Sequence, residues 1–259
     1  MFRGAYGISP KMALSFAQKV LNSKRAVILF HTWTVTRELV AQAIREKRSM
    51  DLDVCVDDRG NPYLGHPKEY HEKTHEPLFN SMPLWEAVEA LTHSTIPVIV
   101  DCKHFSAWPV VEDIVSQLHP ERCLVHSFVS ELKFGAGRTQ AEPDFLSEWS
   151  SMENLRMLKR QFPALTTTAS AKWLPADVLV SEEYQALLVR IVQLLKEYGV
   201  DTVCLNVPDS TFSDRTLRLF LQENILAHVH VDRVDWRRLS EMYIGETDQL
   251  EFTSPGDLF

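Results

Sequence analysis

The sequence predicts an α/β protein in which strands and helices alternate along the whole chain. Runs typical of strands are each followed by a run whose apolar residues have helical spacing, which indicates a parallel sheet with helices outside it. Eight such units in about 250 residues match a closed (β/α)8 barrel, and this chain has 259 residues. We therefore expect residues 1–259 to form a single (β/α)8 (TIM) barrel domain. A doubly wound open sheet is the alternative.

The predicted strands are short runs rich in β-branched and other apolar residues, separated by turn-forming or helical segments. They lie at 26–31, 49–56, 97–103, 122–128, 164–170, 200–207, 225–231 and 248–254. The turn sequence DDRGNP after the second strand also predicts a returning hairpin strand at 63–66. We therefore expect a β-hairpin insertion after strand two.

The predicted helices have apolar residues three and four positions apart, as on one face of a helix. They lie at 34–47, 83–93, 108–118, 152–162, 182–199, 213–224 and 235–243. An N-terminal amphipathic helix over 10–23 is expected to cover one face of the barrel.

Composition limits the classes of function. Lys and Arg number 27 against 35 Asp and Glu, giving a formal net charge of −8, which argues against nucleic-acid binding and electrostatic attachment to anionic lipid. Lys11, Gln18 and Lys19 interrupt the first apolar residues, so no signal peptide is expected. No apolar run approaches the roughly 18 residues of a membrane span, so no transmembrane segment is expected either.

Four cysteines lie inside strand-like apolar runs, and they are Cys55, Cys102, Cys123 and Cys204. Buried, reduced thiols in such positions are typical of a reducing compartment. We therefore expect a cytoplasmic protein.

Polar residues gather where the predicted strands end, which is where the active sites of such barrels lie. His31 ends the first strand, Asp51 and Asp53 lie on the second, and Asp101 and Lys103 end the third. Because side chains alternate along a strand, each of the two pairs shares one face and can point into the barrel mouth.

Three carboxylates at one point predict a site for a hard divalent cation, Mg²⁺ or Ca²⁺. His31 and His66, the latter on the hairpin, are candidates for a general base and a general acid, because an ordinary histidine has a pKa of about 6.5.

These residues carry a resemblance to a known family. The stretches ILFH (28–31), MDLDVCVDDRGNPYLGH (50–66) and PVIVDCK (97–103) resemble the glycerophosphodiester phosphodiesterases. That family has a strand-end His, an acidic pair, a DG turn, a second His and an acidic residue before Lys. HSF (126–128) and the two closing strands extend the resemblance over about residues 26–257. The related sphingomyelinase D type phospholipases have Asp before the Lys, as here.

The resemblance implies a phosphoric diester hydrolase. It places a metal on Asp51, Asp53 and Asp101, makes His31 and His66 the acid/base pair, and sets Lys103 on the phosphate. The substrate implied is a small-molecule or lipid phosphodiester, either a glycerophosphodiester or a lysophospholipid, which would place the protein in lipid metabolism. Its oligomeric state is unknown.

Three departures from the family pattern predict a divergent member. His-Arg-Gly has become His31-Thr32-Trp33, which removes an arginine that would bind phosphate bidentately. Glu has become Asp51, and His-Asp has become His66-Pro67. The alternative is a catalytically inactive barrel that binds a phosphate ligand or acts as a regulatory protein.

Trp33 follows the predicted base and is a candidate substrate-binding residue. Trp108, Trp149 and Trp173 fall just beyond three later strands, so the four rings form a candidate apolar pocket, with loop anchoring as the alternative. Two further motifs are weak. HEKTH (71–75) has the spacing of a zinc site but polar flanks, and KFGAGR (133–138) reads as a flexible loop or a lid.

Overall fold

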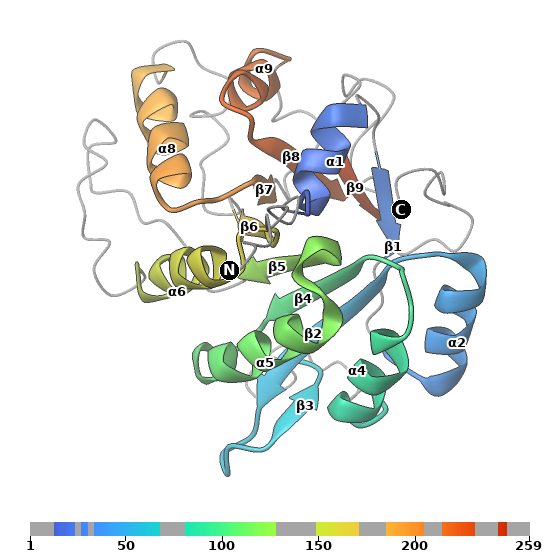
Figure 1. Ribbon diagram of the computed structural model, residues 1–259. Helices are drawn as coiled ribbons and strands as arrows, with labels where there is room; N and C mark the ends of the chain where they lie inside the picture. The colour runs from blue at the N-terminus through green and yellow to red at the C-terminus, as the bar shows by residue number, and fades with distance from the viewer. Residues whose placement is uncertain are drawn as a thin grey trace, which may run out of the picture.

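The computed structural model describes residues 13–23, 27–30, 34–67, 81–127, 149–170, 185–204, 214–230 and 243–247, and the structural statements below concern these. Figure 1 shows an α/β arrangement in which all described helices except the N-terminal one lie around the outside of a single sheet. The α/β class predicted from the alternating pattern is therefore confirmed.

The described strands form one nine-stranded sheet with the order β1-β9-β8-β7-β6-β5-β4-β2-β3. The strands are β1 (Val27–Phe30), β2 (Met50–Val56), β3 (Pro62–Leu64), β4 (Val98–Cys102), β5 (Cys123–Ser127), β6 (Thr166–Ser170), β7 (Thr202–Cys204), β8 (Leu226–His230) and β9 (Tyr243–Thr247). Every neighbouring pair is parallel except β2 and β3. Eight parallel strands and one hairpin insertion match the predicted count.

Closure of the barrel is not confirmed. β1 approaches β2, but no ladder of hydrogen bonds joins them in the described residues. β3 pairs with the second half of β2, from Val54 to Val56, so that part of the strand edge is already occupied. The sheet has the strand order of a barrel and remains open at this seam.

The described helices alternate with the strands as predicted, and most of their ends shift by only a few residues. All but the last residue of the helix predicted at 235–243 lie outside the described residues. They are α1 (Phe16–Ser23), α2 (Arg37–Glu46), α4 (Leu84–Thr92), α5 (Trp108–Leu118), α6 (Trp149–Gln161), α8 (Gln185–Glu197) and α9 (Asp214–Gln222), with the 3₁₀ turns η1 (Phe105–Ala107) and η2 (Pro120–Arg122). Local capping sets some of these ends. Thr36 accepts a hydrogen bond from the amide of Leu39 and starts α2, as helix N-caps commonly do.

The last described strand begins at a residue that the sequence pattern assigns to a helix. β9 begins at Tyr243, which was assigned to the end of a helix at 235–243, and the predicted strand 248–254 lies outside the described residues. The β-prone pair Tyr243 and Ile244 gains hydrogen-bonded neighbours on both sides here, because β9 pairs with β1 and with β8. For Tyr243, hydrogen bonding of β9 to both β1 and β8 outweighs the helical spacing of the sequence.

Two apolar layers hold the sheet. The larger lies between its outer face and the surrounding helices. In the smaller, Phe16, Ala17 and Val20 of α1 pack on inner-face residues near the N-terminal ends of the strands, namely Leu29, Ile99, Leu124 and Leu226. The N-terminal helix therefore covers the inner face at the end of the sheet opposite the predicted chemistry.

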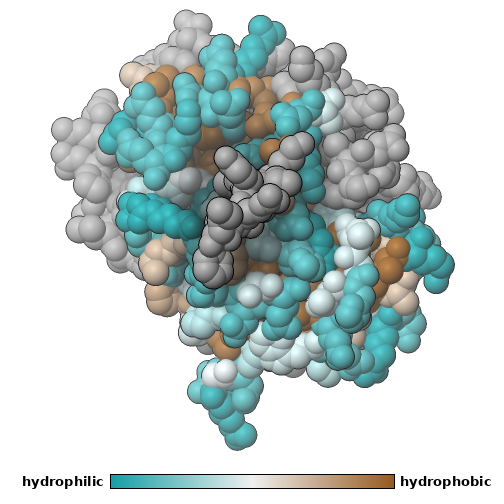
Figure 2. All heavy atoms as spheres, in the orientation of Figure 1, coloured by the Kyte–Doolittle hydropathy of each residue, from teal (hydrophilic) through white to brown (hydrophobic). Residues whose placement is uncertain are grey.

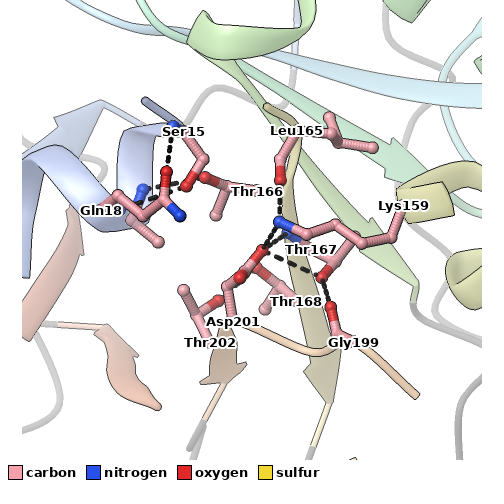
Figure 3. A network of polar contacts seen from close by, with 11 residues as sticks. Ser15, Gln18, Lys159, Leu165, Thr166, Thr167, Thr168, Gly199, Asp201 and Thr202 are labelled. Carbon is pink, nitrogen blue, oxygen red and sulfur yellow. Dashed lines mark hydrogen bonds and ion pairs between the residues drawn. The ribbon is translucent and has the colours of Figure 1, made fainter. Parts of the chain in front are cut away.

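A polar network fixes the same N-terminal end (Figure 3). The amide of Ala17 donates to Thr166 Oγ1 at 2.9 Å, which ties α1 to β6. On the other side of β6, Lys159 Nζ lies 2.7 Å from Asp201 Oδ2, and the amide of Thr167 donates to the same carboxylate at 3.0 Å. Polar side chains thus link α1 and α6 to the N-terminal end of β6.

The visible surface in Figure 2 is mainly hydrophilic where residues are described. Among the described residues, large hydrophobic side chains that are exposed occur singly, at Leu14 before α1, Trp85 of α4, Phe105 of η1 and Met157 of α6. No helix in the described ranges is both long enough and apolar enough to cross a bilayer.

Candidate functional site

Two carboxylates lie side by side on the inner face of the sheet. In the register between β2 and β4, Asp53 lies opposite Asp101, and Asp51 lies opposite Ile99. All three aspartates are buried. Because paired residues of parallel strands point to the same face, Asp53 and Asp101 approach each other, and Asp51 lies one layer nearer the N-terminal end.

Lys103 places its ammonium group between these two carboxylates. Its backbone amide donates to the carbonyl of Val54 at 2.9 Å, so the residue stays beside β2 after β4 has ended. Lys103 Nζ lies 2.5 Å from Asp101 Oδ2 and 3.1 Å from Asp53 Oδ1. Only 8% of the lysine side chain is exposed, so water screens these contacts very little.

The hairpin returns His66 to the same site. Asp57 Oδ1 accepts hydrogen bonds from the amides of two residues in the turn, and Gly60 has a φ of 81°, which favours glycine. After β3, the amide of Gly65 donates to the carbonyl of Asp53 at 2.8 Å. This leaves His66 Nε2 3.2 Å from Asp53 Oδ2.

His126 is a site residue that the sequence analysis missed. It lies on β5 directly opposite Asp101 in the register, and its Nδ1 atom is 3.3 Å from Asp101 Oδ2. The signal in the sequence was a histidine two positions after Leu124, and so on the same face of a strand that is otherwise apolar. The resemblance drew attention to Ser127 and the residue after it instead.

These contacts form a continuous buried ion chain, His66–Asp53–Lys103–Asp101–His126. It runs from the hairpin across β2 and β4 to β5. We call this set of five residues the ion chain. Its members lie on β2, just after β3, at the end of β4 and on β5, and the sheet register brings them together.

The ion chain stabilises its own charges. Burial raises the pKa of Asp101, but Lys103 and His126 oppose this more strongly and hold that pKa well below its usual range. Burial lowers the pKa of Lys103, and the three nearby aspartates outweigh burial, so the pKa of Lys103 lies above its usual value. Asp101 and Lys103 are therefore both charged at neutral pH.

The donors and charge of this site suit a hard divalent cation. Three ionised aspartates and one protonated lysine give a formal charge of −3 + 1 = −2 when both histidines are neutral. Asp101 Oδ1 is buried and has no hydrogen-bond partner among the described residues, which is an arrangement that a bound ion would satisfy.

The side chains of the three aspartates do not converge on one point as the ligands of a metal ion would. Within the described ranges, no group of three or more His, Cys, Asp or Glu side chains is placed so that it could hold a metal ion. Lys103 occupies the space between Asp53 and Asp101. A cation shared by those two carboxylates would require the ammonium group to move.

Several predicted residues lie outside the described residues. They are His31, Trp33, Trp173, the side chain of Trp149, and the segments 71–75 and 133–138. Trp108 is described, and its predicted place in a substrate pocket is wrong. It is 8% exposed and belongs to the apolar layer between the sheet and the helices, because it starts α5 and packs there with the rest of that helix.

Comparison with known proteins supports the fold. No protein-family model matches the sequence, and no curated protein matches it. Among solved structures, a glycerophosphoryl diester phosphodiesterase from Parabacteroides distasonis is similar, with a TM-score of 0.51, 11% identity, and coverage of 92% of this chain and 90% of that chain.

An oxaloacetate acetylhydrolase in complex with its product oxalate is similar to about the same degree. Its TM-score is 0.50 and its identity 10%, with 90% of this chain and 79% of that chain covered. These two enzymes act on different bonds, so the likeness shows a shared fold, and the function has to be argued from the residues of the site.

Proposed function

We propose that this protein is a divalent-cation-dependent phosphodiesterase acting on a glycerophosphodiester or a lysophospholipid-like substrate. The observation that carries the proposal is the ion chain, which brings together carboxylates, a lysine and a histidine of the types a phosphodiesterase uses. The fold shared with a glycerophosphoryl diester phosphodiesterase supports the same function.

In this proposal Asp51, Asp53 and Asp101 hold the cation and Lys103 binds the phosphate. A bound divalent ion would offset the negative charge that develops on the phosphoryl oxygens. Lys103 is already protonated and buried, so its charge acts on a substrate phosphate with little screening. It would exchange its contact with Asp53 for one with a phosphoryl oxygen.

His66 is the proposed acid/base residue within the described part of the site. Asp53 faces its Nε2 atom, which orients the ring. The ring would then exchange a proton with the attacking or leaving oxygen through Nδ1. His31, the second acid/base residue implied by the resemblance, completes the proposal.

Location and specificity follow from weaker observations. All four cysteines are buried thiols outside any disulfide bond, which supports a reducing compartment such as the cytoplasm. Trp33 would supply apolar surface beside the phosphate and so favour a diester that carries an acyl chain.

A substrate screen tests the function. Glycerophosphocholine, glycerophosphoethanolamine and lysophosphatidylcholine below its micelle concentration would each be incubated with Mg²⁺, Ca²⁺ or Mn²⁺, and in parallel with excess EDTA. We expect cleavage that EDTA abolishes and that Asp51→Asn strongly reduces. Asp113→Asn, at an exposed position of α5, is the matched control and should retain full activity.

The screen also tests the alternative, a non-catalytic protein that binds a phosphate ligand. Such a protein would bind the diesters, as seen by calorimetry, without releasing product under any metal condition. Turnover that is equal in EDTA and in Mg²⁺ would contradict the metal-dependent mechanism.

A further inference from the structure

Two donors converge on a single oxygen of Asp101. Lys103 Nζ lies 2.5 Å and His126 Nδ1 3.3 Å from the same atom, Oδ2. The other oxygen, Oδ1, is buried and has no hydrogen-bond partner among the described residues. The carboxylate is thus held by one oxygen only.

This division of the carboxylate has an energetic consequence. A buried carboxylate oxygen without a partner is costly, by roughly 1–3 kcal/mol for an ordinary polar group and more for a charged one. Rotation about the Cβ–Cγ bond of Asp101 would bring Oδ1 toward a donor, but it would also disturb the contacts of Oδ2. A second donor on Oδ2 makes that rotation less favourable.

We propose that His126 is a positioning residue that, together with Lys103, fixes Oδ2 of Asp101 so that Oδ1 is presented to the divalent cation. The proposal rests on the phosphodiesterase function proposed above and on Asp101 as a cation ligand. It assigns His126 a role that the sequence motifs do not indicate. Ligand orientation by a neighbouring hydrogen-bonded side chain is common at metal sites.

The surroundings of His126 favour this role over a purely structural one. Leu124, two residues earlier on the same face of β5, packs against α1 in the small apolar layer. A second apolar residue on this face of β5, at position 126, would extend that layer and would require no buried partner. An imidazole at this buried position instead needs a polar contact, and Asp101 provides it.

Two substitutions separate the roles. His126→Asn keeps an N–H donor attached to Cγ, near the place of Nδ1, whereas His126→Leu removes the donor and keeps an apolar side chain of similar volume. For both variants and the wild type we would measure Mn²⁺ affinity by electron paramagnetic resonance, kcat and KM for the best diester, and Tm. His93→Leu, at an exposed position after α4, is the control.

We expect His126→Leu to weaken Mn²⁺ binding by about 10- to 100-fold and to lower kcat with little change in KM. His126→Asn should recover most of both losses. A lower Tm for His126→Leu with unchanged Mn²⁺ affinity and kcat would overturn the proposal, as would equal losses in the Leu and Asn variants or a wild type that binds no Mn²⁺.

The binding and kinetic measurements can refute the positioning role and the phosphodiesterase function separately. If the wild type binds Mn²⁺, His126→Leu weakens that binding and no diester is cleaved, the positioning role stands and the phosphodiesterase function falls. If the wild type cleaves a diester in a metal-dependent manner and His126→Leu behaves as the wild type, the function stands and the positioning role falls.

Discussion

Replacing Lys103 by methionine would remove the central positive charge of the ion chain while keeping a side chain of similar length. Asp53 and Asp101, whose oxygens lie 3.1 and 2.5 Å from Nζ, would then be buried without their shared counter-charge. Breaking a buried pair by removing one partner typically costs about 3–5 kcal/mol. We therefore expect Lys103→Met to lower the free energy of unfolding at pH 7 by about that amount.

The loss should depend on pH with a definite sign. In the wild type the folded-state pKa of Asp101 is lowered, so its stabilising contribution is present above the unfolded value of about 3.9 and is lost as pH falls further. In Lys103→Met the effect of burial is no longer opposed by the ammonium group, and the folded-state pKa of Asp101 rises. The variant then binds a proton more readily when folded, and its deficit shrinks from pH 7 to pH 5.

Urea unfolding followed by circular dichroism at pH 7 and pH 5 provides the measurement. Lys196→Met is the control, because Lys196 pairs with Glu223 on the surface with both side chains largely exposed, and such pairs contribute about 0–1 kcal/mol. The reasoning is refuted if Lys103→Met is no more destabilising than the control, or if its deficit is the same at both pH values.

The same variant probes the cation site. With the ammonium group gone the formal charge changes from −2 to −3, so Mg²⁺ should stabilise Lys103→Met more than the wild type. A ligand at 100 times its Kd stabilises by about 2.7 kcal/mol, which a urea titration resolves. Equal or smaller stabilisation of the variant by Mg²⁺ would count against a cation at these aspartates.

Three further outcomes are expected. His66→Ala should lower kcat by about 10²- to 10⁴-fold with an unchanged circular dichroism spectrum, and near-normal turnover would remove His66 from the mechanism. Asp201→Asn should lower the free energy of unfolding by about 1–3 kcal/mol, measured in urea, because Lys159 loses its ion pair and the amide of Thr167 a charged acceptor; no loss would show that this network contributes nothing to stability. Trp33→Gly should reduce the preference for lysophosphatidylcholine over glycerophosphocholine, compared as kcat/KM, and an unaltered ratio would exclude Trp33 as the selector.

The strand pattern alone predicts that the aspartates and Lys103 lie close together. Asp53 and Asp101 lie on adjacent parallel strands, and alternation along each strand determines which face they share. The position of Lys103 between the two carboxylates was not predictable, because it depends on the amide of Lys103 bonding to β2 after β4 ends. Sequence alone does not show such a contact across strands.

The roles of His126 and of Tyr243 in β9 were missed because both depend on contacts with distant segments of the chain. A single histidine on an apolar strand is common in protein cores, and only the register opposite Asp101 gives it a partner. Tyr243 was assigned to a helix because the residues before it have a weak helical period, whereas its state depends on pairing with β1 and β8. Both errors concern long-range pairing, which local patterns do not contain.

The position of α1 divides the molecule into two ends with different sensitivities. Ser15 and Gln18 cap this helix reciprocally, and Phe16 packs on the inner face against Ile99 and Leu124, one layer nearer the N-terminal ends of the strands than the ion chain. Substitutions around α1 are therefore expected to change the Tm more than they change the proposed activity. Mutagenesis that aims at a more thermostable variant should therefore begin with α1 and leave the ion chain unchanged.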